Sequence, residues 1–222
     1  MNGVIVTLAG IVLATTFVGS TLAETVSGTP WIIDGDTIAI GPAVIRLHGV
    51  DAPETGQSCA DARDRPYRCG IAALDGLRGL IGSKTVACQA IDRDRYDRLI
   101  ATCRTGEMDL NAEMVRRGLA IAYRRFSDDY LAEEIEAQNA QRGLWSGTFE
   151  APEAVRDQLW NDATVQAPHG CPIKGNISDR GRIYHTPWSQ YYARTRINTA
   201  RGERWFCSEA EAKAAGWRPP YR

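Results

Sequence analysis

Charged side chains are spaced through three short segments of an otherwise apolar, strand-like stretch of this sequence. The segments are Asp34-Gly35-Asp36-Thr37, residues 46–54, and Asp94-Arg95-Tyr96-Asp97-Arg98. Carboxylates supply the oxygen ligands that hard divalent cations prefer, and forked guanidinium groups neutralise phosphate. A further carboxylate can activate water. The combination contains the parts that a phosphodiesterase needs.

The second segment predicts a strand that aims one of these side chains. Ile45 and Leu47 alternate with Arg46 and His48 over residues 44–50. Because successive side chains of a strand point to opposite faces, Arg46 and His48 should project from the face opposite the apolar pair.

Four further strands are expected at residues 25–33, 37–40, 84–91 and 99–104, from apolar, β-favouring runs bounded by turn signals. Helical spacing of apolar residues predicts one helix over 71–81 and another over about 110–118, and Ser127-Asp128-Asp129 is expected to cap a third. The hairpin-like succession of strands argues against a doubly wound sheet. We predict an α+β, mainly β fold: an OB-fold five-stranded barrel with three helices, followed by a small C-terminal domain.

Residues 1–23 carry no charged side chain and end in a small-x-small pattern, Thr21-Leu22-Ala23. This pattern predicts a secretory signal peptide, although the usual basic start is missing. An uncleaved membrane anchor is the alternative.

The six cysteines all follow this segment, and an even number in an exported chain favours disulfides. Of the 15 possible connectivities, local geometry favours pairing nearest neighbours. Cys88 and Cys103 flank a hairpin symmetrically, Cys59 with Cys69 would close a short loop, and Cys171 with Cys207 would staple the C-terminal region. Free thiols or metal ligands are the alternative, but there is no C-x-x-C pair.

Charge is distributed unevenly along the chain. Residues 1–160 carry 16 Lys and Arg against 22 Asp and Glu, whereas residues 161–222 carry 10 against 5. This excludes a uniformly basic nucleic-acid-binding protein. We predict one domain over 24–150, a connector over 151–167 that runs along the surface, and a basic, aromatic-rich accessory domain over 168–222.

Taken together, residues 26–145 resemble the thermonuclease family, the staphylococcal-nuclease-like phosphodiesterases. The resemblance rests on motifs that occur in the order typical of the family: Asp34-Gly35-Asp36-Thr37, Arg46-Leu47, Val50-Asp51, Pro53-Glu54, Asp94-x-Tyr96-x-Arg98, and Asn111-x-x-Met114-Val115-x-x-Gly118-Leu119-Ala120. It implies cleavage of DNA or RNA to 3′-phosphate and 5′-hydroxyl ends, with Ca2+ as the cofactor.

The resemblance also implies roles for individual residues. Asp36 and Asp51 would bind the metal through their carboxylates, and Ala52 through its backbone carbonyl, where family members often have Thr. Two or more such oxygen donors with water suit Ca2+.

Three further residues would act on the phosphodiester. Arg46 and Arg98 would hold the phosphate, and Glu54 would position or deprotonate the attacking water. Each has an ordinary alternative: Arg46 could form a surface ion pair, Arg98 could be an edge-strand charge, and Glu54 could be an exposed loop carboxylate. Their occurrence together in family order favours the active-site reading.

The remaining assignments concern substrate contacts. Arg95 and Tyr96 resemble contacts to a terminal phosphate, and Tyr123 resembles a base-stacking residue. His48 is expected to be structural or peripheral. Asp34 and Asp36 could also form no more than a hairpin turn.

Three functions remain open from the sequence. An exported nuclease that acts on nucleic acid is favoured, because the chain has every acid and arginine that the resemblance assigns to the active site. We expect this nuclease to be a monomer without stable membrane association. A catalytically weak nuclease-like barrel that binds nucleic acid or another polyanion is the first alternative. An exported enzyme acting on a different polyanion, such as a phosphorylated envelope polymer, is the second. In the C-terminal part, Trp188, Tyr191 and their basic neighbours would either help to hold nucleic acid or pack as an inert cap.

Overall fold

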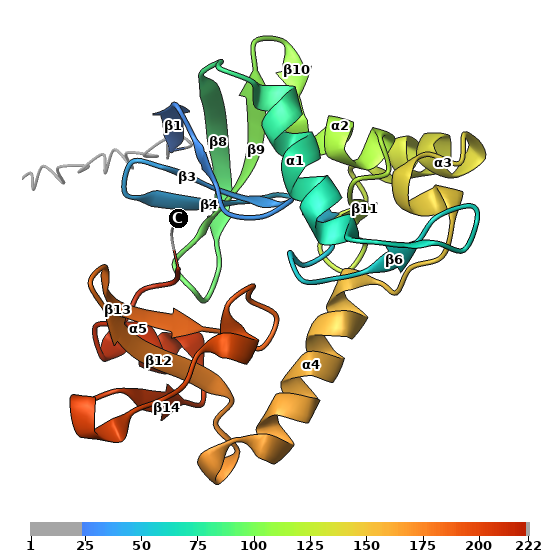
Figure 1. The fold of residues 1–222 in the computed structure, drawn as a ribbon. Helices are drawn as coiled ribbons and strands as arrows, with labels where there is room; N and C mark the ends of the chain where they lie inside the picture. The colour runs from blue at the N-terminus through green and yellow to red at the C-terminus, as the bar shows by residue number, and fades with distance from the viewer. Residues whose placement is uncertain (1–23, 221–222) are drawn as a thin grey trace, which may run out of the picture.

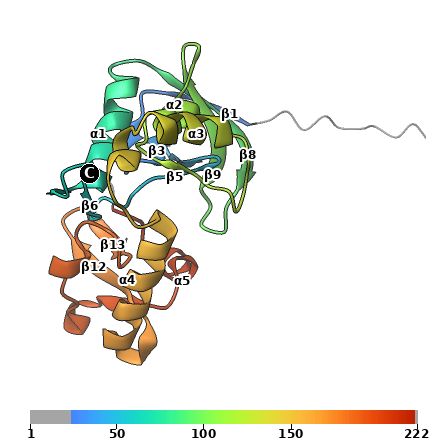
Figure 2. The same ribbon diagram turned by 90° about the vertical axis from the view of Figure 1, so that its right-hand side faces the viewer.

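A computed structural model describes residues 24–220, so the expected signal peptide lies outside the described residues. The chain forms two lobes, an N-terminal lobe built on a curled sheet and a smaller C-terminal lobe, joined by a long helix (Figure 1). Figure 2 shows the C-terminal lobe below the N-terminal lobe and next to it. No helix among residues 24–220 is long and apolar enough to span a bilayer.

The N-terminal lobe is organised by a seven-stranded sheet in the order β1-β8-β9-β4-β3-β2, with β10 paired to β9. In this sheet β4 and β9 pair in parallel, and the other neighbouring strands pair antiparallel. The bounds are β1 Thr25–Gly28, β2 Trp31–Ile32, β3 Thr37–Ile40, β4 Ala43–Leu47, β8 Val86–Arg93, β9 Leu99–Thr105 and β10 Met108–Asp109. The expected OB-type, mainly β fold is confirmed.

One strand predicted from the sequence is divided into two strands in the structure. The run at 25–33 is split around Thr29-Pro30 into β1, which pairs with β8, and β2, which pairs with β3. Proline lacks the N–H that a continuous ladder would require. The split lets one stretch of chain contribute to both ends of the curled sheet.

Helices cover one side of this sheet and close its core. They are α1 Cys69–Ile81, α2 Leu110–Arg116 and α3 Leu131–Asn139, followed by the 3-10 turn η1 Gly143–Ser146. Helix α1 buries Ala73, Leu77 and Ile81 against the strand residues Ile38, Ile45 and Leu47. The short pairs β5 Val50–Asp51 with β11 Ile121–Ala122, and β6 Cys59–Ala60 with β7 Pro66–Tyr67, complete the lobe.

The expected cap of α3 is wrong. The residue that precedes the helix is Tyr130, whose side chain makes no capping hydrogen bond. Ser127 Oγ accepts a hydrogen bond from the Asp129 N–H (3.0 Å), so its hydroxyl is used inside the loop. Glu133 and Glu134 supply the negative charge of the first turn instead.

The C-terminal lobe is a three-stranded antiparallel sheet in the order β13-β12-β14, with one short helix against it. Its core contains Ile173, Tyr184, Phe206, Ala212 and Trp217. The bounds are β12 Ile173–Ser178, β13 Gly181–His185, β14 Arg204–Phe206 and α5 Glu209–Ala214, with 3-10 turns η2 Pro168–Gly170, η3 Tyr192–Arg194 and η4 Thr199–Arg201.

Helix α4, Pro152–Gln166, occupies the region expected to be a connector. It buries only Pro152 and Ala163, so it has no continuous apolar stripe to signal a helix in the sequence. Proline at its first position suits a helix start, because the missing N–H is one that would be unpaired there anyway. The domain boundaries at 150 and 168 stay predictions.

All three expected disulfides are present: Cys59 with Cys69, Cys88 with Cys103, and Cys171 with Cys207. Cys88 and Cys103 are direct partners in the β8–β9 register. The hairpin symmetry in the sequence therefore gave the correct pairing.

We expect Cys88→Ala/Cys103→Ala to lower the free energy of unfolding by about 3 kcal/mol, because the bond closes a short loop and restricts the unfolded chain. Denaturant unfolding of the oxidised protein measures this. Peptide mapping without reduction should recover the three pairs, and free thiols or an unchanged denaturation midpoint would contradict the assignment.

His185 gives the C-terminal lobe a specific sensitivity to acid. Burial, followed by the nearby Lys174 charge, lowers the pKa of His185 to about 4. The folded state therefore keeps the imidazole neutral while the unfolded chain takes up a proton near pH 6.5, so stability is full above that pH and is lost as pH falls towards 4. Hydrogen exchange of β12–β13 amides should show this loss in the wild type and a weaker pH dependence in His185→Asn. Parallel curves would contradict it.

Candidate active site

The acidic turn between β2 and β3 contains the buried carboxylate of Asp36. Asp34 Oδ1 accepts the Asp36 N–H (3.1 Å), which forms the turn expected from the sequence. Asp36 is only 3% exposed. Its Oδ1 accepts from Thr37 Oγ1 (2.9 Å), and its Oδ2 accepts from the Ala52 N–H (3.0 Å). Asp36 is therefore held by the first residue of β3 and by the loop after β5.

Arg46 on β4 joins this carboxylate to a second one. Its Nη1 donates to Asp36 Oδ1 (2.9 Å) and its Nη2 to Asp51 Oδ1 (2.8 Å). The Arg46 side chain is 16% exposed and lies 5.8 Å from the Tyr123 ring centre. Asp51, at the end of β5, is fully buried. Arg46 thus bridges two buried acids and is not a surface ion pair.

A second arginine reaches the site from α4. Arg156 Nη2 donates to Asp51 Oδ2 (3.0 Å), while Nη1 lies 3.0 Å from Asp51 Oδ1 and donates to Glu54 Oε1 (2.9 Å). The Arg156 side chain is 16% exposed. Asp36, Arg46, Asp51, Arg156 and Glu54 therefore form one continuous chain of charged hydrogen bonds.

Negative charge in this network is only partly compensated. Burial raises the pKa of Glu54 to about 7, with Asp36 and Asp51 adding to the rise and Arg156 opposing it. Burial and the same kind of neighbours raise the pKa of Asp34 well above its usual range. Burial acts in the same direction on Asp36, but the charges of Arg46 and Arg156 and the hydrogen bonds from Ala52 and Thr37 together outweigh it, and the pKa of Asp36 is lowered. With Asp34 beside the three carboxylates of the network, four acidic groups lie near two guanidinium groups.

The β8–β9 turn holds a separate group of the predicted residues. Asp94 Oδ1 accepts the N–H groups of Tyr96 (2.8 Å) and Arg98 (2.9 Å), and Asp94 Oδ2 accepts from Arg98 Nε (2.7 Å). The guanidinium carbons of Arg95 and Arg98 lie 4.7 and 5.4 Å from the Tyr96 ring centre. Within residues 24–220, no hydrogen bond joins this group to Asp36, Asp51 or Glu54.

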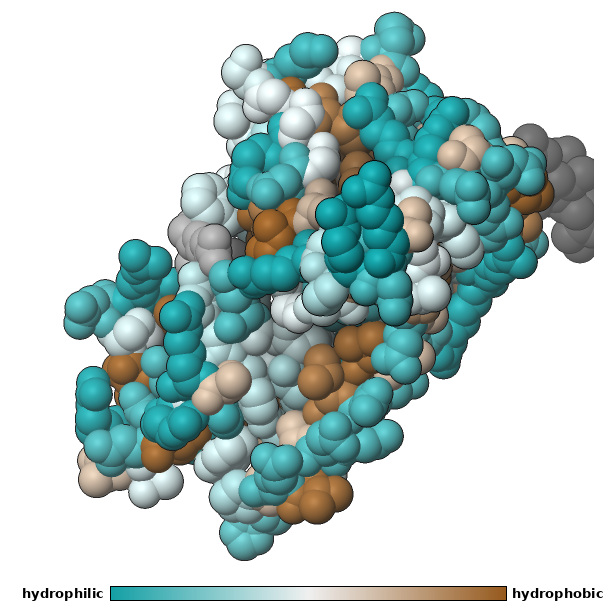
Figure 3. Space-filling model, turned by 45° about the vertical axis from the view of Figure 1, so that its right-hand side comes forward, coloured by the Kyte–Doolittle hydropathy of each residue, from teal (hydrophilic) through white to brown (hydrophobic). Residues whose placement is uncertain are grey.

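Arg46, Glu54 and Arg156 of the buried network line one cleft of about 1530 Å³ between the two lobes, together with residues 92–98 of the β8–β9 turn. Tyr123 also lines it, and its ring packs edge-on against Phe126 at 4.8 Å. The C-terminal part contributes Trp188 to the opposite wall, where it lies 6.0 Å from the Trp160 ring on α4. Figure 3 shows the surface hollowed where the lobes meet, with hydrophilic residues at the rim.

The structure does not show a preassembled set of metal ligands. Among the residues described, no group of three or more His, Cys, Asp or Glu side chains is placed to hold a metal ion. What it does bring together is the carboxylates of Asp36 and Asp51, on either side of Arg46. His48 instead lies 2.8 Å from Asp129 through its Nε2, outside this network, as expected for a peripheral residue.

The sequence was compared with protein-family models and with known proteins. Residues 44–147 match the family described as Staphylococcal nuclease homologue, and residues 161–219 match the family described as ArfC. The "Succinoglycan biosynthesis protein ExoI" of Rhizobium meliloti (strain 1021) is 36% identical over 141 residues, which cover 60% of this chain and 72% of the relative.

An "Uncharacterized endonuclease" of Escherichia coli O157:H7 is 34% identical over 128 residues, covering 54% of this chain and 77% of the relative. The chain belongs to the staphylococcal nuclease family. A "Probable endonuclease LCL3" of Colletotrichum graminicola (strain M1.001 / M2 / FGSC 10212) is also 34% identical over 128 residues, but only 45% of that longer relative is covered. The expected enzyme class, a nuclease-type phosphodiesterase, is confirmed for this staphylococcal nuclease homologue.

Arg156 is the residue of the network that the sequence did not reveal. It lies beyond the matched range 44–147 and belongs to no motif. The one available signal was that it is the only basic residue of α4, PEAVRDQLWNDATVQ. Without knowing that 152–166 form a helix directed at the cleft, nothing distinguished Arg156 from a surface charge.

We expect Arg156→Ala to raise the pKa of Glu54 further, because the variant loses the positive charge that opposes burial. Carboxyl-carbon NMR titration of the metal-free protein should show Glu54 titrating near pH 7 in the wild type and at higher pH in the variant. Arg125→Ala serves as the matched control. It removes an exposed arginine that lies outside α4 and pairs with Glu153, a residue of α4. An unchanged or lower Glu54 pKa in Arg156→Ala would contradict the role of this contact.

Proposed function

We propose that this protein is an exported, Ca2+-dependent nuclease that hydrolyses phosphodiester bonds in DNA, RNA or both, leaving 3′-phosphate and 5′-hydroxyl ends. The observation that carries the proposal is the buried network in which Arg46 bridges Asp36 and Asp51 and Arg156 bridges Asp51 and Glu54. Arg46, Glu54 and Arg156 of this network lie in the wall of a cleft between the two lobes, and ligand sites commonly occur between domains.

The donor set fits a hard divalent cation. It offers only oxygen atoms, from the Asp36 and Asp51 carboxylates and the backbone of Ala52, whose N–H is already bonded to Asp36. Burial is the main cause of the raised pKa values of Asp34 and Glu54, and neighbouring carboxylates add to the rise in both. When bound, a cation would supply charge stabilisation for the phosphate oxygens.

The chain's own groups supply the remaining functions. Arg46, and Arg98 from the β8–β9 turn, would hold the phosphate and stabilise the charge that grows on its oxygens during attack. Glu54 would position the attacking water and accept its proton. A pKa of about 7 suits this task, because a base is most effective when its pKa is near the working pH.

The walls of the cleft would hold the rest of the substrate. We assign a terminal phosphate to Arg95 and Tyr96, and base stacking to Tyr123, all of which line the cleft. Three disulfides are consistent with export to an oxidising compartment. The protein would act as a monomer, without stable membrane association.

One observation favours the alternative of a catalytically weak binding module. Arg156 occupies both carboxylate oxygens of Asp51 and one of Glu54, the groups assigned to metal and water. A site that keeps this guanidinium during turnover would have a less basic Glu54 and weaker affinity for a cation. Activity measurements separate the two functions.

Single- and double-stranded DNA and RNA should be cut by the oxidised protein with Ca2+ and left intact with chelator. Arg46→Ala and Glu54→Gln should each lower kcat/KM at least 100-fold, about 3 kcal/mol of transition-state stabilisation. Arg65→Ala removes an exposed partner of Asp61 and should leave the rate unchanged. Metal-independent cleavage would contradict the Ca2+ assignment, and binding of all four nucleic acids without any cleavage would favour the binding module.

A further inference from the structure

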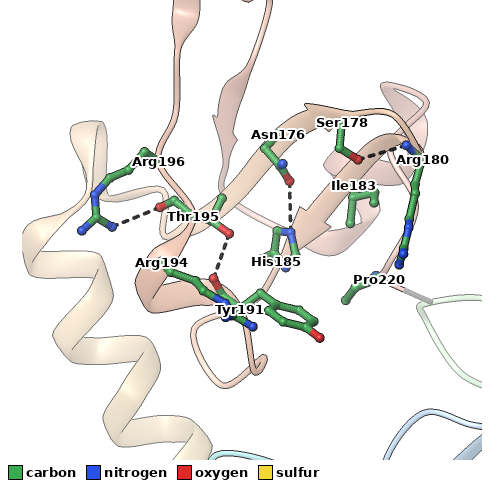
Figure 4. Close-up of a pocket in the computed structure, with 10 residues that line it drawn as sticks. All are labelled: Asn176, Ser178, Arg180, Ile183, His185, Tyr191, Arg194, Thr195, Arg196 and Pro220. Carbon is green, nitrogen blue, oxygen red and sulfur yellow. Dashed lines mark hydrogen bonds between the residues drawn. The ribbon is translucent and has the colours of Figure 1, made fainter. Parts of the chain in front are cut away.

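A second hollow, separate from the nuclease network, lies within the C-terminal lobe. It encloses about 380 Å³, a size suited to a small organic group, between the β12–β13 hairpin and the segment around η3. Figure 4 shows Arg180 and Arg194 on opposite sides of it, with His185 and Tyr191 between them.

The charged side chains that line this hollow are all positive. It contains Arg180, Arg194 and Arg196 and no Asp or Glu. None of the three forms an ion pair with a carboxylate among residues 24–220. Arg194 lies over the Tyr191 ring at 4.2 Å, and Arg196 donates to the backbone carbonyl of Ala193 (2.6 Å). By contrast, the arginines of the N-terminal lobe are mostly paired with acids.

The pKa values of Lys174 and His185, next to the hollow, are affected by this positive charge. Burial and then the Arg196 charge lower the pKa of Lys174, and the Lys174 charge adds to burial in lowering that of His185. An anion placed between these side chains would relieve this repulsion, whereas a cation would increase it.

One lining residue, His185, also has a buried hydrogen-bond acceptor without a partner among the described residues. His185 is 5% exposed, and its Nε2 is 3.0 Å from Asn176 Oδ1. Since the amide oxygen can only accept, Nε2 carries the proton in this pairing and Nδ1 is left as an acceptor. Nδ1 has no partner in the part of the chain that the structure describes. A ligand with two anionic groups would pair with the arginines of this lining.

We propose that this hollow is a nucleotide subsite, in which Arg180 and Arg194 hold the phosphates on either side of one nucleotide of the substrate strand. The proposal rests on the proposed nuclease function. Tyr191 and Pro220 line both this hollow and the nuclease cleft, so a strand can pass from one to the other without leaving the protein surface. Tyr191 supplies a ring on this path against which a base can stack.

The test compares two double variants in the full, oxidised chain. Arg180→Ala/Arg194→Ala removes the charges of the hollow, and Arg63→Ala/Arg201→Ala removes two arginines outside it. In a Glu54→Gln background with chelator present to prevent cleavage, fluorescence anisotropy with a single-stranded 12-mer should show a dissociation constant about tenfold higher for the first pair than for the second. The slope of log K against log salt should fall by about 1.4, as expected for two lost phosphate contacts on a single strand.

Additional measurements fix the ligand and its source. With Glu54 intact, the first pair should keep wild-type kcat/KM on a small chromogenic phosphodiester, which does not reach the hollow. If the first pair loses binding of a nucleoside monophosphate but not of the 12-mer, the subsite takes the free product rather than the strand. Equal 12-mer affinities and salt slopes for the two pairs would overturn the proposal.

Failure of the proposed function would look different. In that case the wild type would cleave no nucleic acid, whereas 12-mer binding would still depend on Arg180 and Arg194. Equal weakening of dextran sulfate and 12-mer binding would instead overturn the assignment of the ligand as a nucleotide.

Discussion

Burying Asp36 and Asp51 is the costliest feature of this fold, and Arg46 is what makes it possible. Two carboxylates removed from water would each cost several kcal/mol without a partner of opposite charge. Arg46 reaches both only because β3 and β4 pair with Thr37 opposite Arg46. A slip of one residue would turn Arg46 to the apolar face, which would leave Asp36 without its ion-pair partner and Asp51 with Arg156 alone. The register of these strands and the charge state of the site therefore depend on each other.

Small residues allow the backbone to bring these groups so close. A Cβ on Gly35 would lie 2.7 Å from that of Ala52, and one on Gly70 would lie 1.7 Å from the Glu54 carbonyl oxygen. Asn111, fully buried on α2, fixes the strand ends from behind: it donates to the carbonyls of His48 and Ala101 and accepts the Cys103 N–H. The motif residues without catalytic chemistry thus set the spacing of those with it.

The sequence predicted what depends on local pattern. Alternation along 44–50 correctly placed Arg46 opposite the apolar face, and hairpin symmetry correctly paired Cys88 with Cys103. It failed where competing local interactions decide, as at Ser127, whose hydroxyl bonds within its loop instead of capping α3. It also failed for α4, because that helix is held at its ends and by a few contacts rather than by an apolar stripe. Arg156 was missed for that reason.

Helix α4 links the two lobes mechanically as well as covalently. Arg156 and Trp160 are four residues apart and so share one face of the helix. Arg156 binds Asp51 and Glu54, while Trp160 packs on the core of the C-terminal lobe and against Trp188. Any rotation of that lobe that moves Trp160 must also move Arg156 relative to Asp51 and Glu54. A cation bound at Asp51 and the Arg156 guanidinium repel each other across the same oxygens, so the position of the lobe and the charge at the site are coupled through one helix face.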